Sequence, residues 1–192
     1  TIRLGRKRLT GHHLLPHEFI LNLVLEKVVR KKVLARLGGR LSYFISGGAP
    51  LNPDVGSFFM ALGVNLLQGY GQTEASPLIS ANRPNSIRIE TVGPPVKGVN
   101  VKLSKNSELL VRGNCLMKGY WKDAKATKET LKDGWLHTGD IAMVDNSGFL
   151  KIVDRKKEMI LVSGFNVYPN EVENVISSHP KVLEVGVIGV SD

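Results

Sequence analysis

Apolar residues near the amino end of the chain recur at the spacing of a helix. Over residues 17–37 the apolar positions follow helical periodicity, and Lys27, Arg30 and Lys31 can share a separate face. A Gly-Gly pair at 38–39 follows, and glycine readily adopts the left-handed conformation that ends many helices. The pattern therefore predicts a helix over 17–37 with a basic face.

Two short apolar runs follow, with a helix signal between them. The run 41–46 predicts one strand and the run 64–67 predicts another. Between them, Asn52 can cap free amide groups and Pro53 fits the first position of a helix, which we expect to end near residue 62. A strand, a helix and a second strand form the parallel unit whose crossover is normally right-handed.

Glycine-rich turns follow both predicted strands. The turns at 47–48 and 69–71 come where the parallel strands end, and open α/β sheets bind ligands at that edge. Glycine lets a flat ligand approach the backbone, and Tyr70 offers a ring for stacking. The alternative interpretation is that these glycines only make turns.

The next part of the chain has a pattern of short strands and turns. Turn signals at 105–107 and 145–148 favour a small antiparallel sheet or barrel. Its predicted strands are 99–104, 107–113, 141–145 and 148–153. Beyond it, a strand-like run at 159–164, a helix over 169–179 and a strand over 183–190 predict the start of a small α+β domain.

The predicted fold class is α/β with several parts. A parallel βαβ portion over 1–91 and an antiparallel sheet or barrel over 92–153 together form a larger domain, 1–153. Five consecutive charged residues at 154–158 form a solvated connector, and 159–192 is the incomplete start of a smaller α+β domain. The last block is too short to fold alone, so we expect an excerpt of a longer protein.

Charge is concentrated at the amino end. The net charge is +9, and residues 1–40 hold most of the excess of Lys and Arg over acidic residues. A solvated basic face, a peripheral contact with an anionic membrane and a nucleic-acid surface all remain open. Phe19 is the only aromatic residue of this segment, so the stacking partners that single strands require are missing and nucleic acid is disfavoured.

The remaining composition is that of an ordinary globular protein. The single cysteine, Cys115, excludes an internal disulfide framework and fits a reducing compartment. No apolar run is long enough to cross a bilayer, and the amino end lacks the order of a signal peptide. We therefore expect a cytoplasmic protein.

Four segments in a fixed order carry a specific resemblance. They are SGGAPL (46–51), QGYGQTEAS (68–76), DGWLHTGD (133–140) and DRKKEMILVSGFNVYPNEVE (154–173). Together they resemble the adenylate-forming family, which comprises acyl-CoA synthetases, luciferases and the adenylation domains of peptide synthetases. The last two segments most resemble long-chain fatty-acid–CoA ligases, and the similarity covers the chain from about Gly38.

The resemblance implies a two-step reaction. A fatty-acid carboxylate attacks the α-phosphate of ATP to give an acyl-adenylate and pyrophosphate, and the thiol of CoA then displaces AMP. The implied cofactors and substrates are ATP or AMP, Mg²⁺, CoA as co-substrate and a fatty acid. Such chemistry needs charge neutralisation and donors that are positioned before reaction.

The resemblance also implies site residues. Thr73 would contact the α-phosphate, Glu74 would hold Mg²⁺, and Asp140 would accept hydrogen bonds from the ribose hydroxyls. The implied nucleotide-binding set is Gly48, Ala49, Pro50, Gln68, Gly69, Tyr70, Gly71, Gln72, Thr73, Asp140, Ile152 and Arg155. Trp135 and His137 are interpreted as structural.

In the same family a short hinge joins the two domains, and the smaller domain rotates between the two steps. Lys157 matches the pivot, and a charged, solvated position can change its backbone angles without opening a core. Ser163, Gly164 and Phe165 would then line the tunnel that admits the pantetheine arm of CoA.

Two expected parts of the family pattern have no counterpart here. They are the phosphate-binding loop before the first motif and a late catalytic lysine, so we expect the isolated chain to be inactive in adenylation. An acyl-AMP ligase or an aryl-acid ligase of the same family remains an alternative. A nucleotide-binding module without catalysis is a further alternative, although Thr73 and Glu74 favour a working site.

Overall fold

The computed structural model describes residues 1–9 and 13–190, whose contacts divide the chain into two compact units. Unit 1 comprises the described residues of Thr1–Gly69 together with Asn82–Glu90. Unit 2 comprises Tyr70–Ala81 and the chain from Thr91 onward. The boundary at Gly69 falls inside one strand, so the predicted nucleotide-binding residues are divided between the two units.

Unit 1 begins with helices. After α1 (Ile2–Leu9), which the sequence pattern did not predict, come α2 (Pro16–Leu25), a π-helical turn η1 (Glu26–Arg30) and α3 (Lys31–Arg36). The last three elements occupy the predicted helix 17–37. Gly38 and Gly39 adopt φ values of +89° and +70° after it. The predicted helix and its glycine ending are therefore confirmed.

The predicted basic face of this helix is wrong at Arg30. Lys27 and Lys31 are exposed, but the Arg30 side chain is fully buried. Its Nε donates to Ala61 O at 3.0 Å, and its Nη1 donates to Glu26 Oε2 at 2.8 Å. The physical reason is the π turn, which inserts an extra residue and rotates Arg30 away from the position that 3.6 residues per turn would give it.

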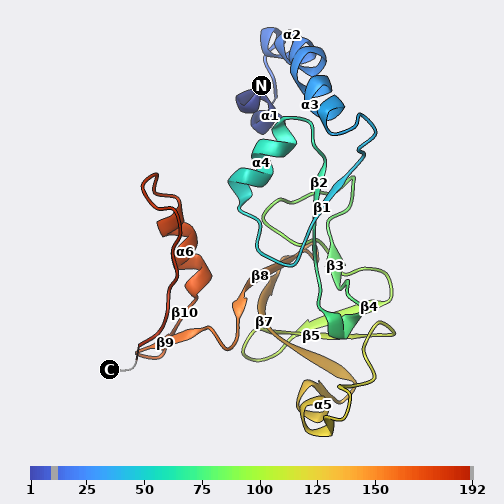
Figure 1. Ribbon diagram of the computed structural model, residues 1–192, viewed down its shortest axis with the longest axis vertical. Helices are drawn as coiled ribbons and strands as arrows, with labels where there is room; N and C mark the ends of the chain where they lie inside the picture. The colour runs from blue at the N-terminus through green and yellow to red at the C-terminus, as the bar shows by residue number, and fades with distance from the viewer. Residues whose placement is uncertain (10–12, 191–192) are drawn as a thin grey trace. The chain divides into compact units, whose positions relative to one another are not determined.

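Helix α4 (Pro53–Ala61) lies between strands β1 (Phe44–Ser46) and β2 (Leu66–Tyr70) in the chain (Figure 1). Asn52 Oδ1 accepts the Asp54 N–H at 2.8 Å, so the predicted cap is present. The two strands pair in parallel, with Ser46 opposite Gln68. The predicted strand–helix–strand unit is therefore confirmed.

Strand β2 begins later than the predicted 64–67 and extends through Gly69 and Tyr70. Val64 is excluded from the strand because its N–H donates to Phe59 O at 3.1 Å, which makes it part of the C-terminal turn of α4. Gly69 and Tyr70 are consequently strand residues, and the predicted turn at 69–71 is wrong at these two positions.

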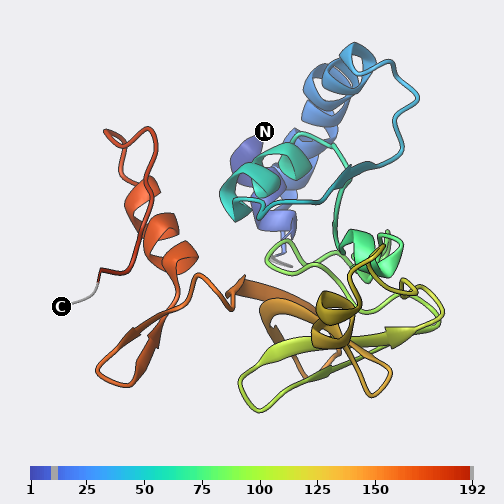
Figure 2. The same ribbon diagram turned by 60° about the horizontal axis from the view of Figure 1, so that its bottom comes forward.

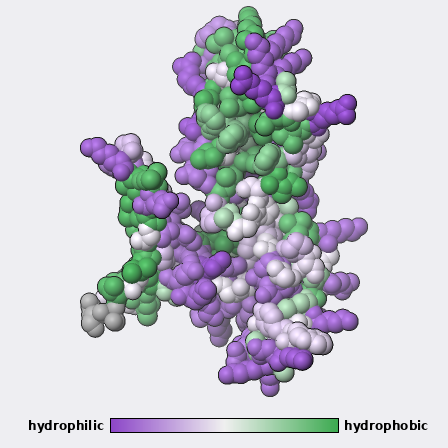
Figure 3. Space-filling model, viewed as in Figure 1, coloured by the Kyte–Doolittle hydropathy of each residue, from purple (hydrophilic) through white to green (hydrophobic). Residues whose placement is uncertain are grey.

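Helix α1 packs closely on α4 within unit 1. A Cβ at Gly5 would lie 2.5 Å from the Cβ of Ala61, so only glycine allows this approach. Leu4 of α1 and Ala61 of α4 are buried, whereas much of α2 exposes apolar side chains. Figure 3 shows apolar surface over the helices of unit 1. None of the described helices is long and apolar enough to cross a membrane.

Unit 2 contains an antiparallel sheet that curls (Figure 2). Its order is β4 (Val99–Leu103), β5 (Glu108–Gly113), β7 (Trp135–Val144) and β6 (Leu131–Lys132), and β8 (Leu150–Arg155) also pairs with β7. All of these pairings are antiparallel. The predicted antiparallel portion is confirmed, although β7 starts six residues before the predicted strand 141–145.

The core of unit 2 is apolar and lies against this sheet. Its fully buried members are Ala75, Ile79, Leu109, Val111, Leu136, Ala142 and Leu150. Burial of each large aliphatic side chain contributes about 1.5–3 kcal/mol. Three short elements complete this part of the unit, namely the 3₁₀ turn η2 (Thr73–Ala75), β3 (Ser80–Ala81) and α5 (Ala124–Thr130). Helix α5 escaped prediction because its sequence, AKATKET, has no apolar periodicity.

After β8 the chain forms a hairpin and a helix. Strands β9 (Ile160–Val162) and β10 (Phe165–Val167) pair in antiparallel fashion, and α6 (Pro169–Ser177) follows. Ser163 and Gly164 form the turn, with φ values of +49° and +86°. Two-residue hairpin turns favour positive φ values at their central residues, because these match the twist of the strands. The turn therefore explains the glycine at 164 without reference to a ligand.

The predicted strand over 183–190 is wrong. No residue of this segment is in a strand, and no described strand pairs with it. Leu183 is 95% exposed, and Ile188 and Val190 are also largely exposed. Apolar alternation alone does not form a strand, because a strand also needs a partner for its N–H and C=O groups.

Candidate functional site

Two residues that lie 70 positions apart in the sequence meet in unit 2. The Tyr70 hydroxyl, at the end of β2, donates a hydrogen bond to Asp140 Oδ2 on β7. Burial raises the pKa of Asp140, and the Tyr70 hydrogen bond and the positive charge of Arg155 oppose that rise. Burial and the neighbouring carboxylate raise the pKa of Tyr70, so its hydroxyl remains a donor.

Strand β8 brings Arg155 beside this pair. Asp140 is the register partner of Arg155 across β7 and β8, and Ile152 is the partner of Ala142, two positions later on β7. The Arg155 side chain is exposed, and its Nη1 lies 3.6 Å from Glu158 Oε1. Three of the predicted nucleotide-binding residues, Asp140, Ile152 and Arg155, therefore lie on adjacent strands of one sheet.

Glu74 lies in η2 and is held by the loop that follows β5. The Tyr120 hydroxyl donates to Glu74 Oε1 at 2.8 Å, and the Met117 N–H donates to the Glu74 carbonyl oxygen at 2.8 Å. Gly71, earlier on the same segment, has a packing requirement of its own, because a Cβ there would lie 1.6 Å from Pro77 O. Thr73 is exposed.

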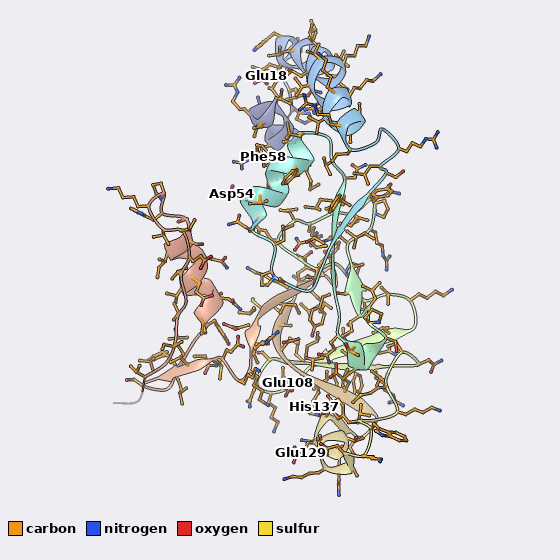
Figure 4. All side chains as sticks on the ribbon, viewed as in Figure 1. Glu18, Asp54, Phe58, Glu108, Glu129 and His137 are labelled. Atoms are coloured by element: carbon orange, nitrogen blue, oxygen red, sulfur yellow. The ribbon has the colours of Figure 1, made fainter. Side chains whose placement is uncertain are left out.

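A polar cavity of about 280 Å³ adjoins Glu74 within unit 2. Acidic, basic and hydroxyl side chains all face it. The lining residues are Gln72, Glu74, Glu108, Tyr120, Glu129, Thr130, Lys132, His137, Thr138, Gly139 and Lys156. Figure 4 labels three of these, Glu108, His137 and Glu129, which come from β5, β7 and α5. The cavity therefore collects side chains from several elements of the unit.

Glu108 is the most buried charged residue of this cavity, at 5% exposure. Its Oε2 accepts from Lys156 Nζ at 3.0 Å and lies 3.5 Å from His137 Nδ1, and its Oε1 accepts the Gly139 N–H at 3.2 Å. Burial raises the pKa of Glu108, but the Lys156 ammonium and the Gly139 N–H outweigh burial and bring the pKa below its ordinary value. The carboxylate is therefore held in its charged form.

The sequence alone did not single out Glu108, Tyr120 or Lys156. Glu108 reads as an ordinary polar position in a strand, and Lys156 reads as one of several charges in a solvated segment. His137, which was interpreted as structural, contacts Glu108 and also lines the cavity. The only sequence signal was the position of Glu108 next to the apolar run 109–111 of a predicted strand, because an acidic residue that is buried in such a strand needs a partner.

The prediction that the charged segment 154–158 is solvated is wrong at Asp154. Asp154 is 1% exposed, and it accepts from the Asn170 N–H at 3.1 Å and from Asn170 Nδ2 at 3.0 Å. The Lys156 N–H donates to Gly139 O at 2.8 Å. Asp154 is buried because these donors at the start of α6 replace water around its carboxylate. Lys157 is exposed, as predicted.

The remaining predicted nucleotide-binding residues lie in unit 1. Gly48, Ala49 and Pro50 are exposed in the turn after β1, and Gly48 has a φ of +85°. A Cβ at Gly47 would lie 3.1 Å from Gly69 O, so this turn passes close to β2. The Gln68 side chain is buried, and its Nε2 donates to Ile89 O, so its amide group is already used within the unit.

The residues present fit one mode of magnesium binding. Among the described residues, no group of three or more His, Cys, Asp or Glu side chains could hold a metal ion alone. Magnesium, however, commonly binds through one or two carboxylates together with substrate phosphates and water. Glu74, which faces a polar cavity, suits a cation that arrives with a nucleotide.

The sequence profile of the AMP-binding enzyme family matches residues 8–121, which is more than half of the chain. The chain belongs to the AMP-binding enzyme family. This membership agrees with the four motifs and with the fold, and it confirms the predicted resemblance.

Curated members of the family are similar over most of this chain. A long-chain-fatty-acid–CoA ligase of Yersinia pestis is 51% identical over 159 residues, which are 76% of this chain and 28% of the relative. Long-chain-fatty-acid–CoA ligase FadD15 of Mycobacterium tuberculosis is 40% identical over 167 residues, or 86% of this chain and 28% of the relative. The chain thus spans little more than a quarter of the length of these relatives.

Solved structures support the same fold. The o-succinylbenzoate CoA synthetase MenE of Bacillus subtilis, in complex with its acyl-adenylate intermediate, has a TM-score of 0.73 and 30% identity, covering 84% of this chain and 37% of MenE. The amide bond synthetase McbA of Marinactinospora thermotolerans has a TM-score of 0.73 and 32% identity, covering 89% and 41%. The anthranilate CoA ligase AuaEII, in complex with anthranoyl-AMP, has a TM-score of 0.69 and 31% identity, covering 77% and 31%.

Proposed function

We propose that this chain is part of an AMP-forming long-chain-fatty-acid–CoA ligase. The observation that carries the proposal is its identity of about half to curated long-chain-fatty-acid–CoA ligases. The pairing of Tyr70 with Asp140 and the polar cavity beside Glu74 support it, because a nucleotide site needs both a ribose acceptor and a ligand for its metal.

In the proposed site, Asp140 binds the ribose of ATP. An ionised carboxylate can accept hydrogen bonds from both ribose hydroxyls, and the Tyr70 hydroxyl already orients one of its oxygens. Arg155, the register partner of Asp140, supplies a positive charge near the ribose or the phosphate, and Ile152 gives an apolar wall. Tyr70, Gly71 and Gln72 follow one another at the end of β2 and continue the nucleotide site.

Thr73 and Glu74 are the proposed catalytic residues. The exposed Thr73 hydroxyl donates to the α-phosphate, which becomes more negative as the fatty-acid carboxylate attacks. Mg²⁺, when bound by Glu74 with the nucleotide, neutralises phosphate charge. The adenine contacts are assigned to the family positions Gly48, Ala49, Pro50, Gln68, Gly69, Tyr70 and Gly71. They would be backbone contacts and stacking on the Tyr70 ring, and would not use the Gln68 amide.

The same proposal assigns the second step to the segment after β8. Lys157 is the pivot between a larger domain, 1–153, and the domain that begins at 159. Its exposure allows a change of backbone angles without the opening of a core. The hairpin of Ser163, Gly164 and Phe165 would then line the path of the CoA pantetheine, whose thiolate attacks the acyl carbonyl and releases AMP.

The test of this proposal uses the complete protein that carries this chain. ATP, Mg²⁺ and palmitate are supplied, and pyrophosphate release and palmitoyl-CoA formation are followed with and without CoA. We expect pyrophosphate release to depend on palmitate and palmitoyl-CoA to form when CoA is present. Absence of both products, with the protein folded and with ATP bound, would refute the proposal.

The structural neighbours favour one alternative within the family. MenE and AuaEII carry aryl acyl-adenylates in their structures, so the fold alone is compatible with an aryl acid. A parallel assay with coumarate, and with a carrier protein in place of CoA, separates an aryl-acid ligase and an acyl-AMP ligase from the proposed function. Higher kcat/KM for coumarate than for palmitate would favour the aryl-acid ligase.

A further inference from the structure

The loop between β5 and α5 holds Glu74 at two points. The Met117 N–H donates to the carbonyl oxygen of Glu74, and the Tyr120 hydroxyl donates to its Oε1, both at 2.8 Å. One hydrogen bond fixes the backbone of η2 and the other fixes the side chain. Glu74 is therefore oriented by a segment that lies more than 40 positions later in the sequence.

Tyr120 is itself fixed by the start of α5. Its N–H donates to Thr127 Oγ1 at 2.8 Å, and the Thr127 hydroxyl donates to Asp123 O at 2.7 Å. Asp123 Oδ1 caps the helix by accepting the Ala126 N–H at 2.8 Å. A Cβ at Gly119 would lie 2.8 Å from Thr127 Cγ2, so glycine is needed where the loop passes the helix. The phenol is thus placed by a capped helix and not by a free loop.

A phenol at this position has a specific chemical consequence. It donates a hydrogen bond without adding a positive charge, so Glu74 keeps its full negative charge for a cation. With Oε1 occupied by Tyr120, Glu74 Oε2 has no recorded partner among the described residues, and Glu74 lines the cavity. A lysine or arginine in place of Tyr120 would neutralise the carboxylate and compete with the metal.

We propose that Tyr120 is a positioning residue for the metal–nucleotide complex, because its hydroxyl holds Glu74 with Oε2 available to Mg²⁺. This inference rests on the proposed function, since it needs a nucleotide whose phosphates complete the coordination of Mg²⁺. Tyr120 contacts neither the substrate nor the metal in this proposal. It acts through Glu74 and removes the need to order that side chain when the metal binds.

The experiment compares Tyr120→Phe with a matched control, Tyr43→Phe, in the complete protein. Tyr43 is an exposed tyrosine of unit 1 and has no recorded side-chain partner among the described residues. The first readout is the Mg²⁺ concentration that gives half-maximal palmitate-dependent pyrophosphate release. The second readout needs no turnover: the Kd of Mn²⁺, measured by electron paramagnetic resonance in the presence of a non-hydrolysable ATP analogue.

We expect Tyr120→Phe to raise both the half-maximal Mg²⁺ concentration and the Mn²⁺ Kd roughly 10- to 150-fold, which is the range for loss of a hydrogen bond to a charged group. The KM for palmitate and the melting temperature should stay close to those of the wild type, and Tyr43→Phe should change nothing.

Unchanged Mg²⁺ and Mn²⁺ dependence in Tyr120→Phe would overturn the inference, and so would a fall in kcat with no change in metal dependence. The two proposals fail separately. If the wild-type protein shows no fatty-acid-dependent pyrophosphate release, the proposed function fails, whereas the Mn²⁺ Kd of the variant still decides the role of Tyr120.

Discussion

The ion pair between Glu108 and Lys156 should contribute measurably to stability, and Lys156→Met tests this. The Lys156 ammonium lies 3.0 Å from the buried Glu108 carboxylate, and the Lys156 side chain is 49% exposed. Its removal leaves the Glu108 carboxylate with the Gly139 N–H and with His137 as its remaining polar neighbours. The variant therefore leaves a buried charge less well compensated.

The expected magnitude follows from the unequal burial of the two partners. Removal of one partner from a buried polar group costs about 1–3 kcal/mol, whereas exposed ion pairs contribute about 0–1 kcal/mol. Because Lys156 is half exposed and two neighbours of Glu108 remain, we expect a loss of about 1–2 kcal/mol. In a protein of this size each kcal/mol lowers the melting temperature by about 2–4 °C.

The measurement is thermal unfolding at neutral pH, with Lys151→Met as the control. Lys151 is an exposed lysine on β8 with no recorded side-chain partner among the described residues. Lys151→Met removes the same side-chain charge from β8, the strand that ends immediately before Lys156. If Lys156→Met and Lys151→Met both melt at the wild-type temperature, the ion pair does not contribute and the reasoning is refuted.

The pH dependence gives the same prediction an independent test. The pKa of Glu108 is lower in the folded protein than its ordinary value of 4.5, so its charged form stabilises the fold. This contribution is fully present above pH 4.5 and is lost as the pH falls through the lowered pKa. Glu108→Gln should therefore be less stable than the wild type at neutral pH, and the difference should shrink in acid. A difference that grows as the pH falls would contradict the assigned direction.

Three further predictions concern other parts of the chain. Asp140→Asn removes a charged acceptor, so the KM for ATP should rise roughly 10- to 100-fold. A rise in KM of less than about twofold would contradict the proposed ribose contact. Gly71→Ala should lower the melting temperature by several degrees because its Cβ would lie 1.6 Å from Pro77 O, whereas Gly186→Ala, with nothing within 4 Å, should not. If the exposed basic residues of the helix at 16–36 contact an anionic membrane, the protein will sediment with anionic vesicles at low salt and be released at high salt. Absence of sedimentation at low salt would contradict the membrane contact and favour a basic face that is only solvated.

Local sequence signals predicted several elements correctly because the physics involved is local. Asn52 caps α4 through its own neighbours, and glycine at 38–39 ends the preceding helix through its own φ values. The parallel pairing of β1 and β2 followed from a strand–helix–strand order that has few alternatives. The family motifs added the candidate residues, because their order along the chain is visible without coordinates.

Long-range contacts account for what the sequence left undecided. The burial of Asp154 depends on Asn170, and the absence of a strand at 183–190 depends on the lack of a pairing partner among the described residues. No periodicity could reveal either fact, because each depends on residues distant in the chain.

The chemistry of the site follows the same division. The sequence by itself determined which residue types stand at Glu74 and Asp140 and the family to which they belong. Only the tertiary structure decided that Tyr120 orients the first carboxylate and Tyr70 the second. The physical reason is that a hydrogen bond between side chains depends on distance in space, which the packing of unit 2 sets and which separation along the chain does not.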